Sequence, residues 1–99
     1  MENRRRSRWA IAWVIKEARG EADITQDQLG GFAGFTDGVI QRTEQARNDT
    51  TVFGLMQMAA VLKISAAELM RRIEEEMQRG PHKPEATIGR PQKKAKKRN

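Results

Sequence analysis

The segment that decides the fold is ITQDQLGGFAGFTDGVIQRTE, residues 24–44. Its Thr25 and Gln28 have the spacing of a capping box, in which a threonine and a glutamine three residues apart satisfy the free amides at a helix N-terminus. The pattern predicts a short helix that ends next to Gly34, because glycine readily adopts the left-handed conformation of a helix C-cap.

The second half of this segment predicts another short helix, residues 36–45. Thr36 is placed to be its N-cap, and Val39 and Ile40 form its inner apolar face. The turn between the two helices is short and contains a glycine. Two short helices joined in this way are typical of the helix-turn-helix motif.

Three further helices are predicted around this pair. Apolar residues at helical spacing indicate one helix over residues 8–19, with Ser7 as its N-cap and with Trp9 and Trp13 in the core. No strand is predicted, so the sequence indicates an all-α fold of five helices.

Capping residues predict where the last two helices begin. Thr50 or Thr51 begins the fourth helix, whose predicted apolar stripe comprises Val52, Leu55, Met56, Ala59 and Leu62. Ser65–Glu68 is a second capping box, and the helix that it opens ends near Arg79, before Gly80.

The composition limits the class of protein. A chain of 99 residues with 37% hydrophobic and 32% charged residues forms one small domain at most. Because the chain has no cysteine and a single histidine, His82, we expect no metal site, no cofactor and no enzymatic activity. No apolar run reaches the ~20 residues that a membrane span requires, so we expect a cytoplasmic protein without a membrane partner.

The charge is unevenly distributed along the chain. The net charge is +4 in residues 1–20, −4 in residues 21–80 and +6 in residues 81–99. The ends are therefore expected to supply most of the attraction to a polyanion. We divide the chain into a basic N-terminal arm (1–7), a helix-turn-helix domain with an extended C-terminal helix (8–79) and a disordered basic tail (80–99).

Five segments between residues 14 and 70 carry a family resemblance: IKEAR, ITQDQLG, AGFT, VIQRTE and LMQMAAVLKISAAELM. They resemble the phage-repressor or Cro-like (Xre-type) helix-turn-helix family, and they fall in its register without an insertion. The resemblance implies a lambda-repressor-like fold that binds double-stranded DNA, with helix 36–45 in the major groove.

The resemblance also implies roles for individual residues. Arg19 and Glu44 stand where the family commonly places an ion pair between the first and third helices. It assigns Gln26 to a phosphate and Asp37, Gly38 and Gln41 to base edges. Thr36, next to Asp37, is also assigned to DNA contact. Arg47 and Asn48 are assigned to the DNA backbone.

Residues of the third helix have alternative interpretations. Asp37 either accepts a hydrogen bond from a cytosine amino group or is an acid stabilised by the helix dipole in the first turn. Gly38 either permits close approach of the helix to the groove or occupies a position with little structural or functional demand on its residue type. Gln41 and Arg42 are better candidates for base or phosphate contact, and the alternative for Arg42 is a solvated surface arginine.

The basic ends also allow two interpretations. Arg4, Arg5, Arg6 and Arg8 either enter a narrow minor groove as an arm or add non-specific attraction. In the tail, Gly89–Pro91 is similar to the core of an AT-hook, a minor-groove peptide, and is otherwise part of a plain polybasic tail.

An apolar stripe along the last helix predicts a homodimer interface made of Leu69, Met70, Ile73 and Met77. The alternative is that this stripe folds back on its own domain. We expect a sequence-specific transcriptional regulator whose dimer binds a palindromic DNA site. We expect it to act as a repressor that occupies its operator.

The competing hypothesis is a protein-binding module. Such a protein would be an antitoxin or an adaptor whose main partner is a toxin or a polymerase subunit. It is motivated by the acidic centre of the chain, by Phe32 and Phe53 at positions that the family usually leaves polar, and by the acidic residues Glu74–Glu76.

Overall fold

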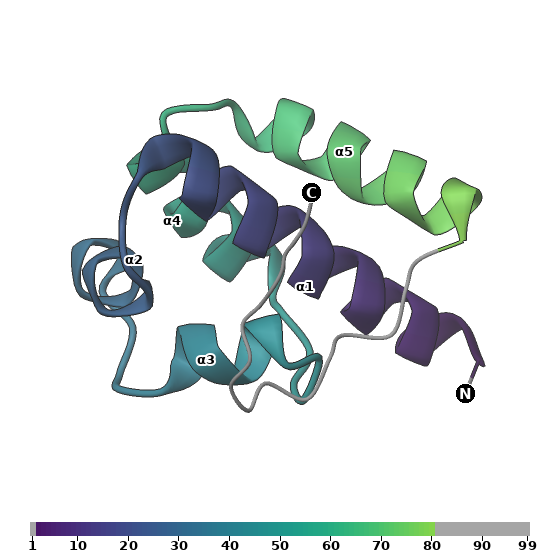
Figure 1. The fold of residues 1–99 in the computed structure, drawn as a ribbon, viewed down its shortest axis with the longest axis horizontal. Coiled ribbons are helices and arrows are strands. Elements are labelled where there is room, and N and C mark those ends of the chain that lie inside the picture. The colour runs from purple at the N-terminus through teal and green to yellow at the C-terminus, as the bar shows by residue number, and fades with distance from the viewer. Residues whose placement is uncertain (1, 81–99) are drawn as a thin grey trace, which may run out of the picture.

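The computed structural model describes residues 2–80, and all structural statements concern this part of the chain. It contains five helices and, within these residues, no strand (Figure 1). The helices are α1 (Glu2–Ala22), α2 (Gln26–Ala33), α3 (Val39–Glu44), α4 (Val52–Leu62) and α5 (Ala66–Arg79). The predicted all-α class is confirmed. The predictions for His82, Gly89–Pro91 and the rest of the tail lie outside the described residues.

Helix α1 is the central element of the fold. It packs against α3, α4 and α5, while α2 packs against α3 and α4. Figure 1 shows α3 and α5 on opposite sides of α1. The largest fully buried side chains come from four of the helices and are Ile15, Leu29, Met58, Leu69 and Ile73. Burial of each such side chain stabilises the fold by roughly 1.5–3 kcal/mol.

The start of α1 differs from the prediction. The helix begins at Glu2, so residues 2–7 are its first turns and not a separate arm. Ser7 lies inside the helix, and its hydroxyl donates to the Arg4 carbonyl at 2.9 Å, so its predicted N-cap role is wrong. The early start has a tertiary cause, because Arg4 contacts Asp49 of the α3–α4 loop and Arg6 contacts α5.

The tryptophans of α1 were predicted in the core, and this is wrong for Trp13, which is 42% exposed. Trp9 is half-buried. The buried face of α1 is instead made of smaller side chains, among them Ala10, Val14 and Ile15. Small residues on this face allow the neighbouring helices to pack closely around α1.

The predicted dimer stripe on α5 is part of the domain's own core. Leu69 and Ile73 are fully buried within the single chain, and Met77 packs against the same cluster, whereas Met70 is 41% exposed. The long α1 explains the difference: it packs along α5, and Arg6 Nη2 donates to the Met77 carbonyl at 3.3 Å. The alternative interpretation, in which the stripe folds back on its own domain, therefore holds for Leu69, Ile73 and Met77, while Met70 stays exposed.

The buried face of α4 also differs from the prediction. Val52 and Met56 of the predicted stripe are exposed, while Met58, which the stripe omitted, is buried beside Ala59 and Leu62. Because α4 contains no charged residue, its sequence gives no polar face from which to orient it. Packing against α2 orients it, with Gln57 Nε2 donating to the Ala33 carbonyl at 3.3 Å.

Side-chain N-caps form at three of the predicted residues, Thr25, Thr51 and Ser65. The Thr25–Gln28 capping box is complete, and Thr51 accepts from the Gly54 amide at 2.9 Å. Ser65 accepts from the Glu68 amide, but the Glu68 carboxylate bonds Arg71 and Arg72 instead of closing a box. Hydrogen bonds from these two guanidinium groups lower the pKa of Glu68 to about 2.

Within the described residues, no single helix has the length and apolar composition needed to cross a membrane. Helices α4 and α5 meet that requirement only when joined, and the chain bends by 109° between them. Residues 3–80 also contain no group of three histidine, cysteine, aspartate or glutamate side chains positioned to hold a metal ion.

Three helices end in non-glycine residues with left-handed backbone: Asp23 after α1, Ala46 after α3 and Lys63 after α4. This conformation costs an L-residue roughly 1–2 kcal/mol. Ala46, at φ +59°, has only a methyl group to lose on replacement by glycine.

We expect Ala46→Gly to raise the free energy of unfolding by about 0.5–1 kcal/mol, because relief of the left-handed strain exceeds the entropy cost of glycine. The matched control is Ala60→Gly, at an exposed position inside α4, which should lower the free energy of unfolding by about 1 kcal/mol. Urea denaturation measures both changes. Equal losses in the two variants would contradict the expected strain at Ala46.

Candidate nucleic-acid interface

The interface is organised by a buried carboxylate at the end of α3. Glu44 is 3% exposed, and both of its oxygens accept hydrogen bonds. Its Oε2 accepts from Arg19 Nε at 2.7 Å, and its Oε1 accepts from Arg19 Nη2 at 3.0 Å and from Gln26 Nε2 at 2.9 Å. The ion pair implied by the family resemblance is therefore present, and it joins α1, α2 and α3 at one point.

This arrangement changes the expected role of Gln26. Its side-chain amide already donates to Glu44, which sequence reasoning did not foresee. A phosphate contact by Gln26 would use the second amide hydrogen or the backbone N–H in the first turn of α2.

The turn between α2 and α3 depends on two glycines. Gly34 is the left-handed C-cap of α2 at φ +81°, as predicted. Gly38, at φ +83°, stands at the N-cap position of α3 without a side-chain cap. The predicted cap role of Thr36 is wrong, because α3 begins only at Val39.

Asp37 consequently lies before α3, exposed to solvent, and not in its first turn. The structural interpretation of this residue as an acid in the first helical turn is wrong. The positive φ of Gly38 favours glycine over other residues, so Gly38 has a backbone role and is not a position under little demand.

The outward face of α3 carries Gln41 and Arg42, both exposed, while Ile40 and Thr43 face inward. A Cβ atom on Gly38 would lie 3.0 Å from Arg42 Nη1, so the guanidinium folds back over the start of α3. Between α2 and α3 lies a cleft of about 350 Å³, whose lining includes Gln26, Thr36, Asp37, Gly38 and Gln41.

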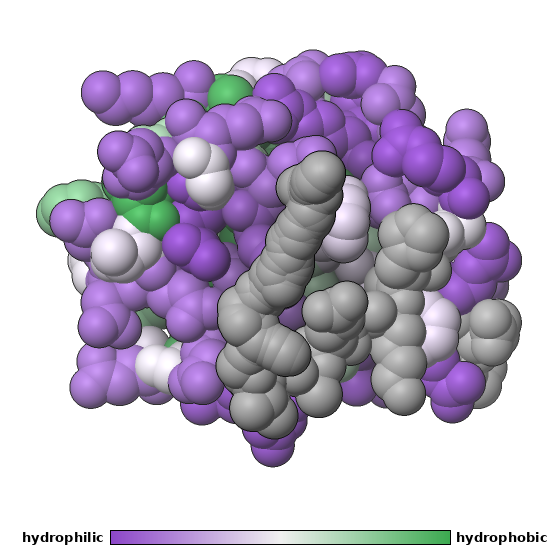
Figure 2. All heavy atoms as spheres, in the orientation of Figure 1, coloured by the Kyte–Doolittle hydropathy of each residue, from purple (hydrophilic) through white to green (hydrophobic). Residues whose placement is uncertain are grey.

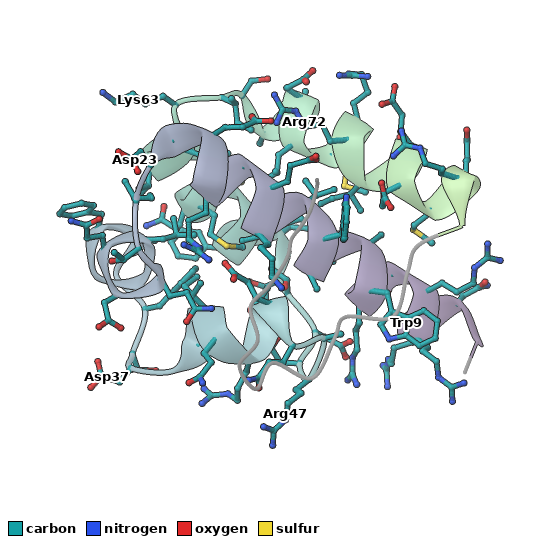
Figure 3. All side chains as sticks on the ribbon, viewed as in Figure 1. Trp9, Asp23, Asp37, Arg47, Lys63 and Arg72 are labelled. Atoms are coloured by element: carbon teal, nitrogen blue, oxygen red, sulfur yellow. The ribbon has the colours of Figure 1, made fainter. Side chains whose placement is uncertain are left out.

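The loop after α3 contains Arg47 and Asn48, the two residues predicted to contact the DNA backbone, and they differ in exposure. Arg47 is exposed, and Figure 3 shows it projecting from the same edge of the molecule as Asp37. Asn48 is half-buried, and its Oδ1 lies 3.2 Å from the hydroxyl of Thr43. Thr43 itself donates to the Val39 carbonyl at 2.9 Å, which satisfies its buried hydroxyl.

The four N-terminal arginines are separated by the helix. Arg8 Nε donates to Asp49 Oδ1 at 2.7 Å, and Arg4 Nε lies 3.4 Å from Asp49 Oδ2. Arg6 points instead to α5, where it bonds the Met77 carbonyl. Arg5 is exposed. Of this group, Arg6 is directed away from the α3–α4 loop.

Asp49 was not foreseen as part of this surface. The Arg8 hydrogen bond lowers the pKa of Asp49, and the nearby Arg4 acts in the same direction. Nothing local in the sequence predicts this contact, because Asp49 and Arg8 are 41 residues apart.

No protein-family model matches this chain, and no curated protein matches it.

The buried ion pair of Arg19 and Glu44 should contribute to the stability of the domain. We expect Arg19→Met to lower the free energy of unfolding by about 3 kcal/mol, because it leaves the Glu44 carboxylate buried without its cation. Replacing both residues, as Arg19→Met with Glu44→Leu, should cost less than the single change. Urea denaturation measures the three values.

The control is Arg71→Met on α5, where the ion pairs are exposed and their loss should cost much less than the loss of the buried pair. A loss for Arg19→Met no larger than that for Arg71→Met would contradict the organising role of the buried pair.

Proposed function

We propose that this chain is a sequence-specific DNA-binding transcriptional regulator of the Cro-like type, in which α2 and α3 form a helix-turn-helix. The observation that carries the proposal is the exposed pair Gln41 and Arg42 on a short helix whose opposite face is anchored by the buried Glu44. A reading helix needs this combination, because its outward side chains must be free while its axis is fixed.

The chemistry of the exposed residues suits base recognition. Glutamine pairs with adenine through two hydrogen bonds, and arginine pairs with guanine in the same way. Asp37, exposed beside the cleft, can accept from a cytosine amino group, and Gly38 lets the backbone approach the groove. Arg47 and the first amides of α2 would contact phosphates on either side.

As a regulator, the protein would repress transcription by occupying its operator as a dimer. Because the α5 stripe is buried, the dimer needs another surface. Exposed apolar side chains on α2 and α4 supply it: Phe32 is 70%, Val52 73% and Phe53 66% exposed. Like-charged chains meet with least repulsion through such a neutral surface, and α4 has no charge.

We expect the double change Gln41→Ala and Arg42→Ala to reduce discrimination between the selected site and random duplex DNA by roughly tenfold or more per side chain, as good two-pronged base contacts are worth about 1–3 kcal/mol each. The site is first found by selection from random duplexes with the full chain. Competition binding at fixed salt then measures the ratio of affinities.

The matched control is Gln78→Ala with Arg71→Ala, which removes the same side chains from exposed positions of α5, on the other side of α1 from α3. Discrimination that is unchanged by the α3 substitutions, or lowered equally by the control, would refute the role of α3.

A second candidate function, a protein-binding module such as an antitoxin or a polymerase adaptor, is favoured by the same apolar residues. The face in Figure 2 is mostly hydrophilic, and the hydrophobic atoms visible there lie mainly toward the edge occupied by α2. Exposed apolar groups set in a charged surface commonly mark a contact with another protein.

Light scattering separates the two candidates. A dimer of the parent chain that becomes a monomer with Phe53→Ser, together with selection of a palindromic DNA site, supports the regulator. A monomer that selects no DNA site, but retains one stoichiometric protein partner through Phe32 and Phe53, supports the protein-binding module.

A further inference from the structure

The N-terminal turns of α1 and the α3–α4 loop together form a concentrated basic surface. Residues 3–8 and 45–51 contain five arginines and a single acid, Asp49. The two segments are far apart in the chain, but the contacts of Arg8 and Arg4 with Asp49 hold them side by side. Figure 1 shows the start of α1 and this loop on the side of the molecule that carries α3.

Asp49 leaves most of the hydrogen-bonding capacity of these arginines available. A guanidinium has five N–H donors, and the contacts to Asp49 are made through the Nε atoms of Arg8 and Arg4. Arg4 is 63% exposed and Asp49 51% exposed, so the pair contributes little stability. Its effect is to position the first turns of α1 against the loop.

The helix places the exposed arginines close together. Arg5 and Arg8 are three residues apart, and Arg4 and Arg8 are four apart, so Arg8 neighbours both on the helix surface. Arg47 lies two residues from Asp49 in the loop, exposed. The result is a group of cations on the first turns of α1, beside the loop that follows α3.

We propose that Arg4, Arg5 and Arg8, presented on the helix and positioned by Asp49, bind phosphates of the DNA that flanks the groove entered by α3. The inference rests on the proposed function, and it assigns to α1 a second, sequence-independent contact with duplex DNA. It differs from a flexible arm because the backbone of residues 2–8 is helical before binding, which lowers the entropy lost in the complex.

The test is the salt dependence of binding to random-sequence duplex DNA, measured with the full chain. The slope of log K against log salt changes by about 0.9 for each phosphate contact. We expect Arg4→Gln with Arg5→Gln to reduce the magnitude of the slope by about 2. The control, Arg71→Gln with Arg72→Gln, removes two arginines of α5 that pair with the partly exposed Glu68 and should leave the slope nearly unchanged.

Equal reductions in the two double variants would overturn the proposal, because the arginines would then act only through net charge. An unchanged slope with Arg4→Gln and Arg5→Gln would also overturn it. Neither result affects the reading role of α3, which depends on Gln41 and Arg42 and is measured by discrimination between sequences. Failure of the parent chain to bind duplex DNA would overturn both.

Ser7→Pro separates a helical surface from an arm. Proline keeps every charge but breaks the helix before residue 7, so residues 2–6 would become an arm. We expect about tenfold weaker binding at fixed salt, from the ordering cost that the helix otherwise avoids. Circular dichroism checks that the rest of the domain stays folded. Binding equal to that of the parent would show that helical presentation is irrelevant.

Discussion

The arrangement of α1, α2 and α3 depends on the buried carboxylate of Glu44. Glu44 stands at the end of α3, where it accepts hydrogen bonds from Arg19 of α1 and Gln26 of α2. A buried charge is tolerated only when it is paired and fully hydrogen-bonded, so the three helices must keep this arrangement for the domain to remain stable. Because Glu44 and Ile40 face inward, Gln41 and Arg42 must face outward. The exposed surface of α3 is thus a consequence of its buried contacts.

A second constraint is the length of α1. Its first turns reach the C-terminal end of α5, where Arg6 donates to the Met77 carbonyl, and the rest of α1 packs along the helix that contains the buried Leu69 and Ile73. The same turns bring Arg8 to Asp49, which converts a predicted arm into part of the folded surface. The N-terminal boundary of α1 therefore decides where the N-terminal arginines lie.

The exposed surface contains two kinds of chemistry that different partners would use. Basic and amide side chains gather around α3 and the start of α1, which suits a polyanion. Exposed apolar side chains such as Phe32 and Phe53 come from α2 and α4, which suits a protein surface, including a second copy of this chain. A dimeric regulator uses both, whereas a protein-binding module needs only the second.

The sequence by itself determined the features that arise within three or four residues. The caps at Thr25 and Thr51 and the left-handed Gly34 are local, so their residue types are sufficient to predict where α2 begins and ends and, to within one residue, where α4 begins. The buried ion pair was available only through family resemblance. Tertiary structure alone decided the start of α1, the buried face of the uncharged α4 and the contact of Asp49 with Arg8. These depend on packing between distant segments, which no local pattern of residues encodes.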